Sequence, residues 1–409
     1  MSRISSFIAQ RIALGRKNSF SATIVRVAIA AVALSVAVMI VGISLVKGFQ
    51  EGVKSKFYEN WGHIHVTPYL ADPNHYLQEE KVQLNDSLVK AIASYDNVKK
   101  VAPFALQSAI IKSKEEMEGI ILKSSFQSAL NTPTLIKGKT IQFFDSAYSN
   151  HIVLSQSLAN KLKVTVNDKI RLYFLLPNSP TPTPRKGIIS GIFETGLQEF
   201  DNQIAFCDHE LIKNVTKDSL TRIQGYEVYV KDLSKIEESK EKIYNDLIEP
   251  PLFAYTIRER FENIFSWLGM MKTNERLIIG IMIIVAIMNM ISTMLILILE
   301  RTQMIGILKS LGMQNTKLSK VFYVSGLRIL LIGLLIGNVL GFLFIFLQKS
   351  FGFIQLNPEV YYVSTAPVVY AWPSFLFINV LVIGVMLLVL LIPTIIIRNI
   401  KPVKALQFK

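Results

Sequence analysis

The feature that most limits what this chain can fold into is a set of long apolar runs that contain no charged residue. A helix that crosses the hydrocarbon core of a bilayer needs about 20 such residues in succession. Four runs meet this requirement: residues 27–46, 277–299, 329–347 and 375–397. We therefore predict a polytopic α-helical membrane protein with four transmembrane helices. The first run is longer than the apolar core of a signal peptide and lacks a small-residue cleavage site after it, which favours an uncleaved anchor.

Four polar side chains interrupt the second and third runs: Asn289, Ser292, Thr293 and Asn338. A polar group in hydrocarbon is costly unless it is hydrogen-bonded, and neighbouring helices commonly provide the partner. We expect hydrogen bonds between helices at these positions.

The formal net charge of +14 gathers in short segments beside the apolar runs. Residues 1–26, 300–320 and 398–409 are strongly basic, whereas residues 47–299 are close to neutral. A basic excess of this kind is typical of short loops that stay on the cytoplasmic side of a membrane. The charge therefore predicts a topology and argues against nucleic-acid binding.

The runs and the charge together predict nine segments. They are a cytoplasmic amphipathic N-terminal helix (1–26), a first transmembrane helix (27–46), a periplasmic domain with stalk helices (47–276), a second transmembrane helix (277–299), a cytoplasmic loop with a short helix (300–320), a third transmembrane helix (321–347), a short periplasmic loop (348–374), a fourth transmembrane helix (375–397) and a cytoplasmic tail (398–409). Both termini are then cytoplasmic.

The large outside domain has a mixed pattern of strands and helices. Period-two alternation predicts strands near 63–66, 169–176 and 225–231, and helical spacing predicts helices at 86–94, 155–162 and 236–247. Residues 108–122 have the pattern of a hairpin that turns at 114–116. We predict a two-lobed α+β domain whose outer lobe lies around 138–224. Cys207 is the single cysteine, so no intrachain disulfide is expected to support the domain.

Apolar side chains at helical spacing continue beyond the first run and precede the second. Phe49, Val53 and Phe57 recur every fourth residue after the first run. Phe261, Phe265 and Leu268 have helical spacing before the second run, so each set lies on one face of its own helix. These segments are either plain linker helices or rigid stalks that transmit motion between the membrane and the outside domain.

Residues 177–184 read PNSPTPTP, which favours an extended segment that does not pair in a sheet. Predicted strands flank the segment, so we expect a protruding loop, either an ordinary exposed loop or one that binds a partner. Its candidate residues are Pro177, Asn178, Pro180, Pro182, Pro184 and the adjacent Arg185.

Motifs for catalysis are weak throughout the chain. Gly138-Lys139-Thr140 ends like a phosphate-binding loop, but Pro133 stands where that motif needs its first glycine. His63 and His65 share one strand face without a third ligand nearby, and residues 207–210 are too close in sequence to form a nucleophilic triad. We expect no catalytic site, no metal and no cofactor in this chain.

Residues 300–313 read ERTQMIGILKSLGM and directly follow the second apolar run. Met304, Leu308 and Leu311 share a helical face, and Gly312 is a natural helix terminator. An amphipathic helix of this kind lies in lipid headgroups or docks into a groove on a cytosolic partner. The candidate contact residues are Glu300, Arg301, Met304, Gly306, Leu308, Leu311 and Gly312.

This segment resembles the coupling helix of FtsX/MacB-like permeases of type VII ABC transporters. The ending PTIIIRNIKPVKALQFK and the plan of four spans with a large domain after the first resemble the same permeases. Residues 187–206 (GIISGIFETGLQEFDNQIAF) are similar to the lipoprotein-releasing permeases of the LolC/LolE family, as are FIAQRIALGRKNSF near the start and VKGFQEGV after the first run.

The resemblance implies a permease without a catalytic site, located in the bacterial inner membrane. It implies a cytosolic ABC ATPase partner (LolD-like) that binds ATP and Mg²⁺, a second permease protomer, an acylated lipoprotein substrate and a periplasmic chaperone (LolA-like). ATP-driven motion would then extract the lipoprotein from the outer leaflet and release it to the chaperone. The LolC-like, LolE-like and homodimeric forms all stay open.

Two further readings also stay open. A permease of this architecture can serve efflux, peptide or antibiotic export, or cell-division signalling, and a copurified lipoprotein or chaperone would discriminate. A membrane-anchored structural or sensor protein would need no ATPase, and its 300–313 helix would be dispensable.

The resemblance also suggests two functional surfaces outside the membrane. Acyl chains need apolar side chains at the outer ends of the first two spans, where Val46, Phe49, Phe265 and Leu268 are the candidates. The alternative for these four residues is packing of the stalks on each other or on a second protomer. The proline-rich loop stands where the LolC-type permease carries its chaperone-binding hook.

Overall fold

A computed structural model describes residues 20–69, 80–129, 132–144, 148–176, 181–218 and 220–392. The chain divides into two compact units, which are described separately. The helical unit comprises the described residues of Met1–Gln50, Leu268–Gln355 and Thr365–Lys409. The α+β unit comprises those of Glu51–Trp267 and Leu356–Ser364. The predicted N-terminal helix before Phe20 and the cytoplasmic tail lie outside the described residues.

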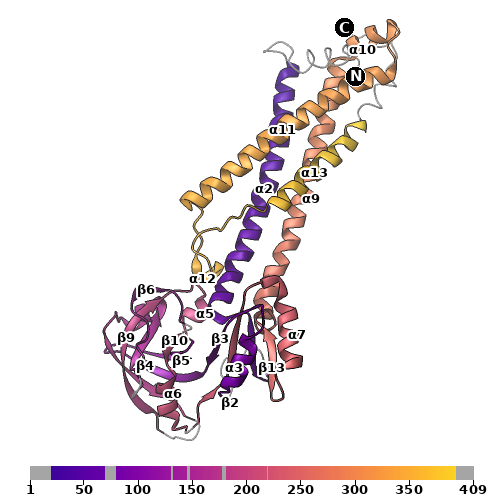
Figure 1. Cartoon of the computed structure of the whole chain (residues 1–409). Helices are drawn as coiled ribbons and strands as arrows, with labels where there is room; N and C mark the ends of the chain where they lie inside the picture. Colours follow the sequence, from indigo (N-terminus) through magenta and orange to yellow (C-terminus); the bar gives the residue numbers. More distant parts are fainter. Residues whose placement is uncertain are drawn as a thin grey trace. The chain divides into compact units, whose positions relative to one another are not determined.

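Within the described part of the chain, four helices are long and apolar enough to cross a membrane (Figure 1). Three contain a predicted run in full, and the fourth contains residues 375–389 of the last run. They are α2 (Phe20–Trp61), α9 (Glu262–Glu300), α11 (Asn315–Phe351) and α13 (Trp372–Val389). The short helix α10 (Thr302–Ser310) connects α9 to α11. Helices α2 and α9 run without interruption from the helical unit into the α+β unit, because neither contains a proline.

Small residues on α11 permit a close approach to α2 within the helical unit. A Cβ atom added to Gly333 would lie 2.9 Å from the Cβ of Val32, and one added to Gly337 would lie 2.6 Å from the carbonyl oxygen of Ala33. Helices pack this way in membranes because small side chains let the backbones come close.

A pair of asparagines joins α11 to α13. The Nδ2 of Asn338 donates to the Oδ1 of Asn379 at 2.7 Å, and the reverse bond measures 3.0 Å. The prediction of an interhelical hydrogen bond at Asn338 is confirmed.

The first sheet of the α+β unit has the order β13-β1-β12-β3, and all its neighbours are antiparallel. Its strands are β1 (Ile64–Pro68), β3 (Val98–Phe104), β12 (Gly225–Val230) and β13 (Leu252–Thr256). Helices α3 (Asp86–Ala93) and α7 (Ile236–Asp246) bury Ile92 and Ile243 in the core that this sheet forms. Strands β2 (Val82–Gln83) and β11 (Arg222–Ile223) form a separate small pair.

The second sheet has the order β6-β9-β7-β10-β5-β4-β8, and β8 also pairs with β9. Its strands are β4 (Leu106–Lys112), β5 (Met117–Ser125), β6 (Leu135–Gly138), β7 (His151–Ser155), β8 (Lys169–Phe174), β9 (Thr183–Phe193) and β10 (Ile204–Asp208). The extra pairing closes six strands into a ring around an apolar core. The ring closes because the first half of the long β9 pairs with β8 and its second half with β7.

The predicted boundary of the outer lobe was wrong at its start. This lobe begins with β4 at Leu106, well before residue 138, because β5 pairs in parallel with β10 and thereby brings the β4–β5 hairpin into the same sheet. The hairpin itself is confirmed. Helices α4 (Gln156–Leu162), α5 (Gln198–Asp201) and α6 (His209–Thr216) complete this lobe, and α8 (Ile257–Arg260) precedes α9.

Candidate functional site

Helix α10 is short, and its C-terminal end is marked by a specific capping motif. Gly312 has φ 85°, a left-handed conformation that glycine adopts without strain. The N–H of Met313 donates to the carbonyl of Leu308 at 2.9 Å, and that of Gly312 to the carbonyl of Lys309 at 3.0 Å. This pair of bonds is a Schellman motif, which ends the helix where the sequence predicted a terminator.

The two faces of α10 differ from the predicted ones. Ile305 and Gly306 are buried, and Ile305 packs in a cluster with Ile298 of α9 and Phe322 of α11. Met304 and Leu308 are half-buried at the edge of that cluster, but Leu311 is 79% exposed. The predicted face of Met304, Leu308 and Leu311 is therefore split, because the helix ends at Ser310 and the chain turns at Leu311.

The exposed side of this turn carries two large apolar side chains. Ile307 is 46% exposed and Leu311 79%, and the polar Gln303, Ser310 and Gln314, which are close to them in the sequence, are also exposed. We call Ile307 and Leu311 the α10 ridge. A small apolar ridge with a polar rim is the kind of surface that docks into a groove on another protein.

The remaining predicted residues at this turn have different surroundings. Glu300 is exposed at the end of α9. Arg301 is half-buried, and its Nε atom has no hydrogen-bond partner among the described residues. Gly306 is buried, so it supports the packing of α10 and does not belong to the exposed ridge.

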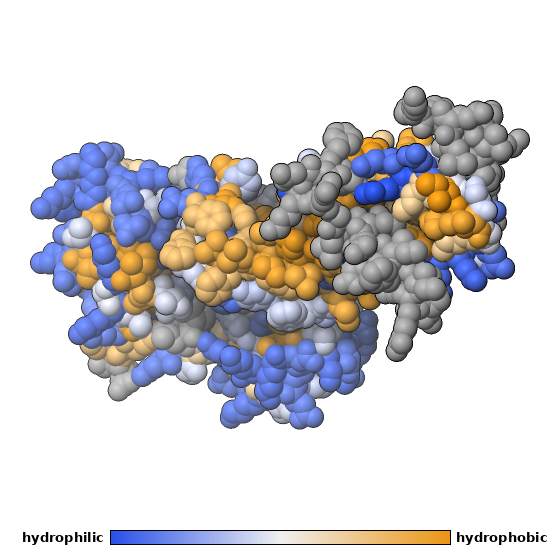
Figure 2. All heavy atoms as spheres, turned by 90° about the horizontal axis from the view of Figure 1, so that it is seen from above, coloured by the Kyte–Doolittle hydropathy of each residue, from blue (hydrophilic) through white to orange (hydrophobic). Residues whose placement is uncertain are grey.

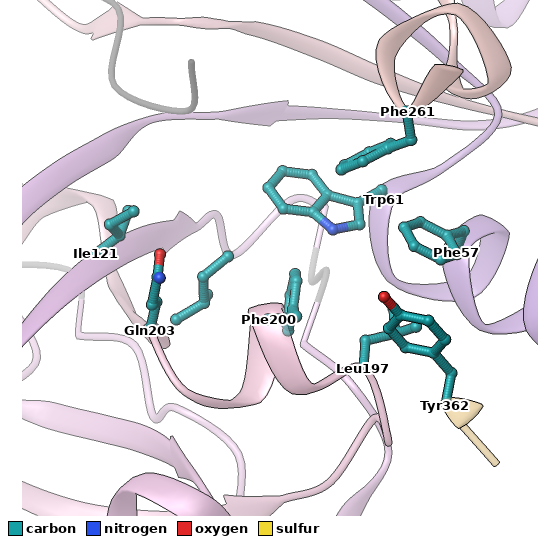
Figure 3. A pocket seen from close by; sticks show the side chains of 9 residues that line it. Phe57, Trp61, Ile121, Leu197, Phe200, Gln203, Phe261 and Tyr362 are labelled. Atoms are coloured by element: carbon teal, nitrogen blue, oxygen red, sulfur yellow. The ribbon is translucent and has the colours of Figure 1, made fainter. Parts of the chain in front are cut away.

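Aromatic side chains inside the α+β unit pack around the C-terminal end of α2. The ring of Phe57 lies 5.0 Å from that of Phe261 and 5.9 Å from that of Phe265. Trp61 is buried and lies 5.2 Å from the ring of Phe200, which belongs to α5. Figure 3 shows the rings of Phe57, Trp61, Phe200 and Phe261 around a small apolar pocket (Figure 3). The ends of α2 and α9 are thus packed together on α5.

Three of the four candidates for acyl-chain contact are buried. Phe49 is 7% exposed, Phe265 is 8% exposed, Leu268 is buried and Val46 is half-buried. In the helical unit the side chain of Gln50 donates to the carbonyl oxygen of Leu268 at 2.7 Å. This burial favours the alternative of packing for Phe49, Phe265 and Leu268, and contact with acyl chains stays a prediction.

A buried ion pair lies beneath the end of α2. The Nζ of Lys123 on β5 lies 2.6 Å from the Oε1 of Glu227 on β12, and both side chains are fully buried. The same ammonium donates to the carbonyl of Asn60 at 3.1 Å and lies 4.5 Å above the ring of Trp61. Burial lowers the pKa of Lys123, and the charge of Glu227 opposes this shift. The cation lies at the negative end of the α2 dipole and links α2 to both sheets.

Two histidines near this pair are engaged in hydrogen bonds. His65 is buried. Its Nδ1 atom is 3.0 Å from an Nη atom of Arg260, and its Nε2 atom is 2.5 Å from the carbonyl oxygen of Trp61. Burial, and then the charge of Arg260, place the pKa of His65 well below its usual value, so the ring is neutral and donates from Nε2. His63 accepts from the N–H of Val230 at 2.9 Å. No group of three metal-ligating side chains occurs within the described ranges.

The proline-rich segment is only partly within the described residues, which exclude Pro177, Asn178 and Pro180. Pro182 precedes β9, but Pro184 and Arg185 lie within it, opposite Tyr173 and Leu172 of β8. Their prediction as loop residues was wrong. Proline is tolerated in this part of β9 because β8 pairs with it on one side only. Arg185 also donates to the Oδ1 of Asn214 on α6 at 3.1 Å.

Sequence reasoning missed the ion pair and its neighbours. Lys123 stands in the apolar strand ending IILKSS, and Glu227 alternates with tyrosines and valines in GYEVYV. A single charge inside an otherwise buried strand is the signal that was available, because such a charge needs a partner.

The architecture is that of a polytopic permease-like protein. Among the described residues it has four long apolar helices, a two-sheet α+β unit inserted between the first and the second, and a short helix after the second. Residues 27–244 match the MacB-like periplasmic core domain family, and the chain belongs to it. Residues 276–402 match the family described as FtsX-like permease C-terminal.

Similar proteins extend over nearly the whole chain. The lipoprotein-releasing system transmembrane protein LolC of Xylella fastidiosa (strain Temecula1) is 23% identical, with 96% of each chain covered. The corresponding LolE of Haemophilus influenzae is 24% identical, with 98% of each chain covered. The periplasmic region of MacB from Actinobacillus actinomycetemcomitans is 12% identical in sequence, covers 51% of this chain and 95% of its own, and superposes with a TM-score of 0.36.

Proposed function

We propose that this chain is the permease subunit of an ABC transporter that releases lipoproteins from the inner membrane. The observation that carries the proposal is the full-length similarity to LolC and LolE proteins, which are named for lipoprotein release. The exposed α10 ridge supports it, because a permease without its own ATPase needs a docking surface for one.

The proposed partners follow from this assignment. A cytosolic ATPase of the LolD kind binds ATP and Mg²⁺ and receives the α10 ridge, and a second permease protomer completes the membrane part. An acylated lipoprotein is the substrate, and a periplasmic chaperone of the LolA kind accepts it. Both termini and α10 are cytoplasmic, while the α+β unit lies in the periplasm.

The proposed mechanism is mechanical transmission. At 1.5 Å per residue, the 42 residues of α2 span about 63 Å without a break. ATP binding moves the ATPase subunits, the α10 ridge passes this motion to α9, and the continuous α2 and α9 carry it to the α+β unit. The buried Lys123–Glu227 pair and the aromatic rings at the C-terminal end of α2 hold this end of the helix in the α+β unit, so that motion of the helix moves the unit with it.

The acyl chains enter in this proposal only when the stalk helices part. Val46, Phe49, Phe265 and Leu268 would then exchange contacts within the chain for contacts with lipid, so the same apolar area stays out of water. The loop before β9, with Pro182 at its described end, is the proposed contact for the chaperone.

The α10 ridge gives the sharpest test. Leu311→Asp combined with Ile307→Asp places two charges on the ridge without touching the buried Ile305. We expect the variant to fold and insert but to lose copurification of the ATPase and ATP-dependent lipoprotein release. Leu233→Asp is the matched control, since Leu233 is 50% exposed in the α+β unit. Full ATPase binding and release by the ridge variant would refute the assignment of the ridge.

A second function within the same architecture is export or signalling by an FtsX/MacB-type permease. Its support is that the two matched families are described by FtsX and MacB. Mass spectrometry of the purified complex discriminates between the two: an acylated lipoprotein supports release, and an export partner or a cell-wall enzyme supports the alternative.

A further inference from the structure

The two ends of the segment between α11 and α13 are joined by hydrogen bonds. We call residues 352–371 the strap. Within the helical unit, Gln348 of α11 is buried, donates to the carbonyl of Ala366 at 2.9 Å and accepts from the N–H of Ile354 at 3.0 Å. The N–H of Ala366 also donates to the carbonyl of Ile354 at 2.9 Å. The two legs of the strap, 352–355 and 365–371, therefore form one hydrogen-bonded base.

The legs also lie directly against α2. Ser44 donates its hydroxyl hydrogen to the carbonyl of Val369 at 2.8 Å and accepts from the N–H of the same residue at 3.2 Å. One turn further along α2, a Cβ atom added to Gly48 would overlap the carbonyl of Pro367. Since only glycine admits the strap backbone at this distance, the contact between the legs and α2 depends on residue 48.

The tip of the strap, Leu356–Ser364, belongs to the α+β unit and includes the short helix α12 (Pro358–Tyr361). The ammonium of Lys56, on α2, donates to the carbonyl of Tyr362 at 2.7 Å. Tyr362 has φ 61°, and its side chain lines the aromatic pocket together with Phe57 and Leu197 (Figure 3). The tip is thus attached to the outer end of α2.

The turn after β9 shapes the site that receives Lys56. Asp201 accepts hydrogen bonds from the N–H of Thr195 at 3.1 Å, from the Thr195 hydroxyl at 2.8 Å and from the N–H of Gly196 at 2.9 Å. Gly196 has φ 73°, and a side chain there would overlap the Lys56 ammonium. This turn lies in residues 187–206, the segment whose sequence is similar to lipoprotein-releasing permeases.

The tip is exposed in its middle and buried at one position near its end. Val360 and Tyr361 are 59% and 43% exposed, whereas Val363 is 7% exposed. In the legs, Ala366 and Val368 are each 9% exposed and Phe353 is 53% exposed. Segments with exposed backbone and few buried apolar contacts open at lower free energy than packed ones. Detachment of the tip can therefore begin at its exposed middle, and the Lys56–Tyr362 bond and the side chains of Tyr362 and Val363 hold the rest of it.

We propose that the tip is a releasable latch: it detaches from Lys56 and the α5 turn when the stalk moves, while the legs stay on α2. Release uncovers the apolar pocket at the end of α2, which Tyr362 lines. The role of the latch in transport rests on the proposed function, but its attachment through Lys56 does not.

Hydrogen exchange on the full-length chain in detergent tests the attachment. Hydrogen bonds from a charged donor are stronger than neutral ones, and a tenfold change in an opening equilibrium corresponds to about 1.4 kcal/mol. Lys56→Met should therefore speed amide exchange in 356–364 about tenfold or more, leave 365–371 unchanged, and be largely rescued by Lys56→Arg. Unchanged exchange at the tip, or equal acceleration in the legs, would overturn the latch.

Reversible crosslinking tests release. Glu59→Cys with Ser364→Cys spans the tip contact without removing Lys56, and both positions line one pocket of the α+β unit. Lys47→Cys with Ser374→Cys is the control in the helical unit, where the native side chains are 2.5 Å apart. A reducible crosslinker at the tip should abolish ATP-driven lipoprotein release until reductant is added, and the control crosslink should leave release near the uncrosslinked rate.

Two outcomes separate the latch from the proposed function. Release at the uncrosslinked rate with the tip locked would overturn latch opening. Absence of release in the uncrosslinked chains would instead contradict the proposed function, and the exchange experiment would then decide alone whether the latch exists.

Discussion

The two units of this protein both bury apolar side chains, but they differ in what they expose and in where they bury charge. The helical unit leaves large apolar residues such as Leu277, Leu335 and Leu376 exposed, while glycines line its inner contacts. The α+β unit instead buries a lysine, a glutamate and an arginine around Trp61. Figure 2 shows hydrophobic surface gathered over the long helices and hydrophilic residues over much of the rest (Figure 2). The surface of the helical unit suits contact with lipid, and that of the α+β unit suits contact with water. Substitutions of the same kind should therefore have different consequences in the two units.

The largest expected effect is in the α+β unit. Lys123→Met leaves the Glu227 carboxylate buried beside a methionine. Breaking a buried ion pair by removing one partner costs about 3–5 kcal/mol. We expect the free energy of unfolding of the full-length chain, measured by denaturant titration in detergent, to fall by that amount.

The control for this prediction removes both charges. Lys123→Met with Glu227→Leu should recover most of the lost stability, because an apolar pair of similar volume needs no compensation. A single variant as stable as the wild type would show that the pair is not buried as described.

A smaller effect is expected at the glycine contact of the helical unit. Gly337→Leu forces a side chain into the space that the carbonyl of Ala33 and the side chain of Val36 occupy. Overpacking of this kind costs about 1–3 kcal/mol. Gly280→Leu is the matched control, because a Cβ there meets nothing within 4 Å. Equal stability of the two variants in the same detergent would contradict the close contact between α2 and α11.

The smallest expected effect depends on pH and on His209. Burial, with the charges of Lys213 and Lys81, lowers the pKa of His209 to about 4. Its pKa in the unfolded chain is about 6.5, so the unfolded state binds more protons between these values. The stability that the neutral ring contributes is full above pH 6.5 and is lost as the pH falls towards 4.

Melting curves at several pH values measure this effect. Between pH 7.5 and 5 the wild type should lose about 1–2 kcal/mol more than His209→Gln, which cannot titrate. His63, whose pKa burial and Lys99 also lower to about 4, remains in both proteins and contributes equally. Parallel pH profiles for the two proteins would exclude His209 as the titrating group.

The sequence predicted those parts of the structure that depend on one local pattern. Apolar runs without charge indicated the four long helices, and alternation indicated the 108–122 hairpin. The boundary of the outer lobe was missed because the β5–β10 pairing joins residues about 80 positions apart, which no local pattern encodes. The faces of α10 were missed because the pattern extended a helix beyond Ser310, where the chain turns.

The candidate sites followed the same rule. The position of α10 and its terminator at Gly312 were predictable, because capping is local. The burial of Phe49 and Phe265 was not, since an amphipathic face does not reveal whether lipid, a partner or another helix covers it. The attachment of Tyr362 to Lys56 joins residues 306 positions apart and gave no signal in the sequence.

The most direct test of the central claim is ATP-dependent lipoprotein release by the reconstituted complex. Vesicles would contain the full-length chain, its copurified ATPase and an acylated lipoprotein, with a soluble chaperone outside. We predict that ATP moves the acylated protein to the chaperone, that the Leu311→Asp, Ile307→Asp variant does not support this transfer, and that an unacylated form gives none. Transfer that is independent of ATP, or unaffected by charges on the α10 ridge, would contradict the account.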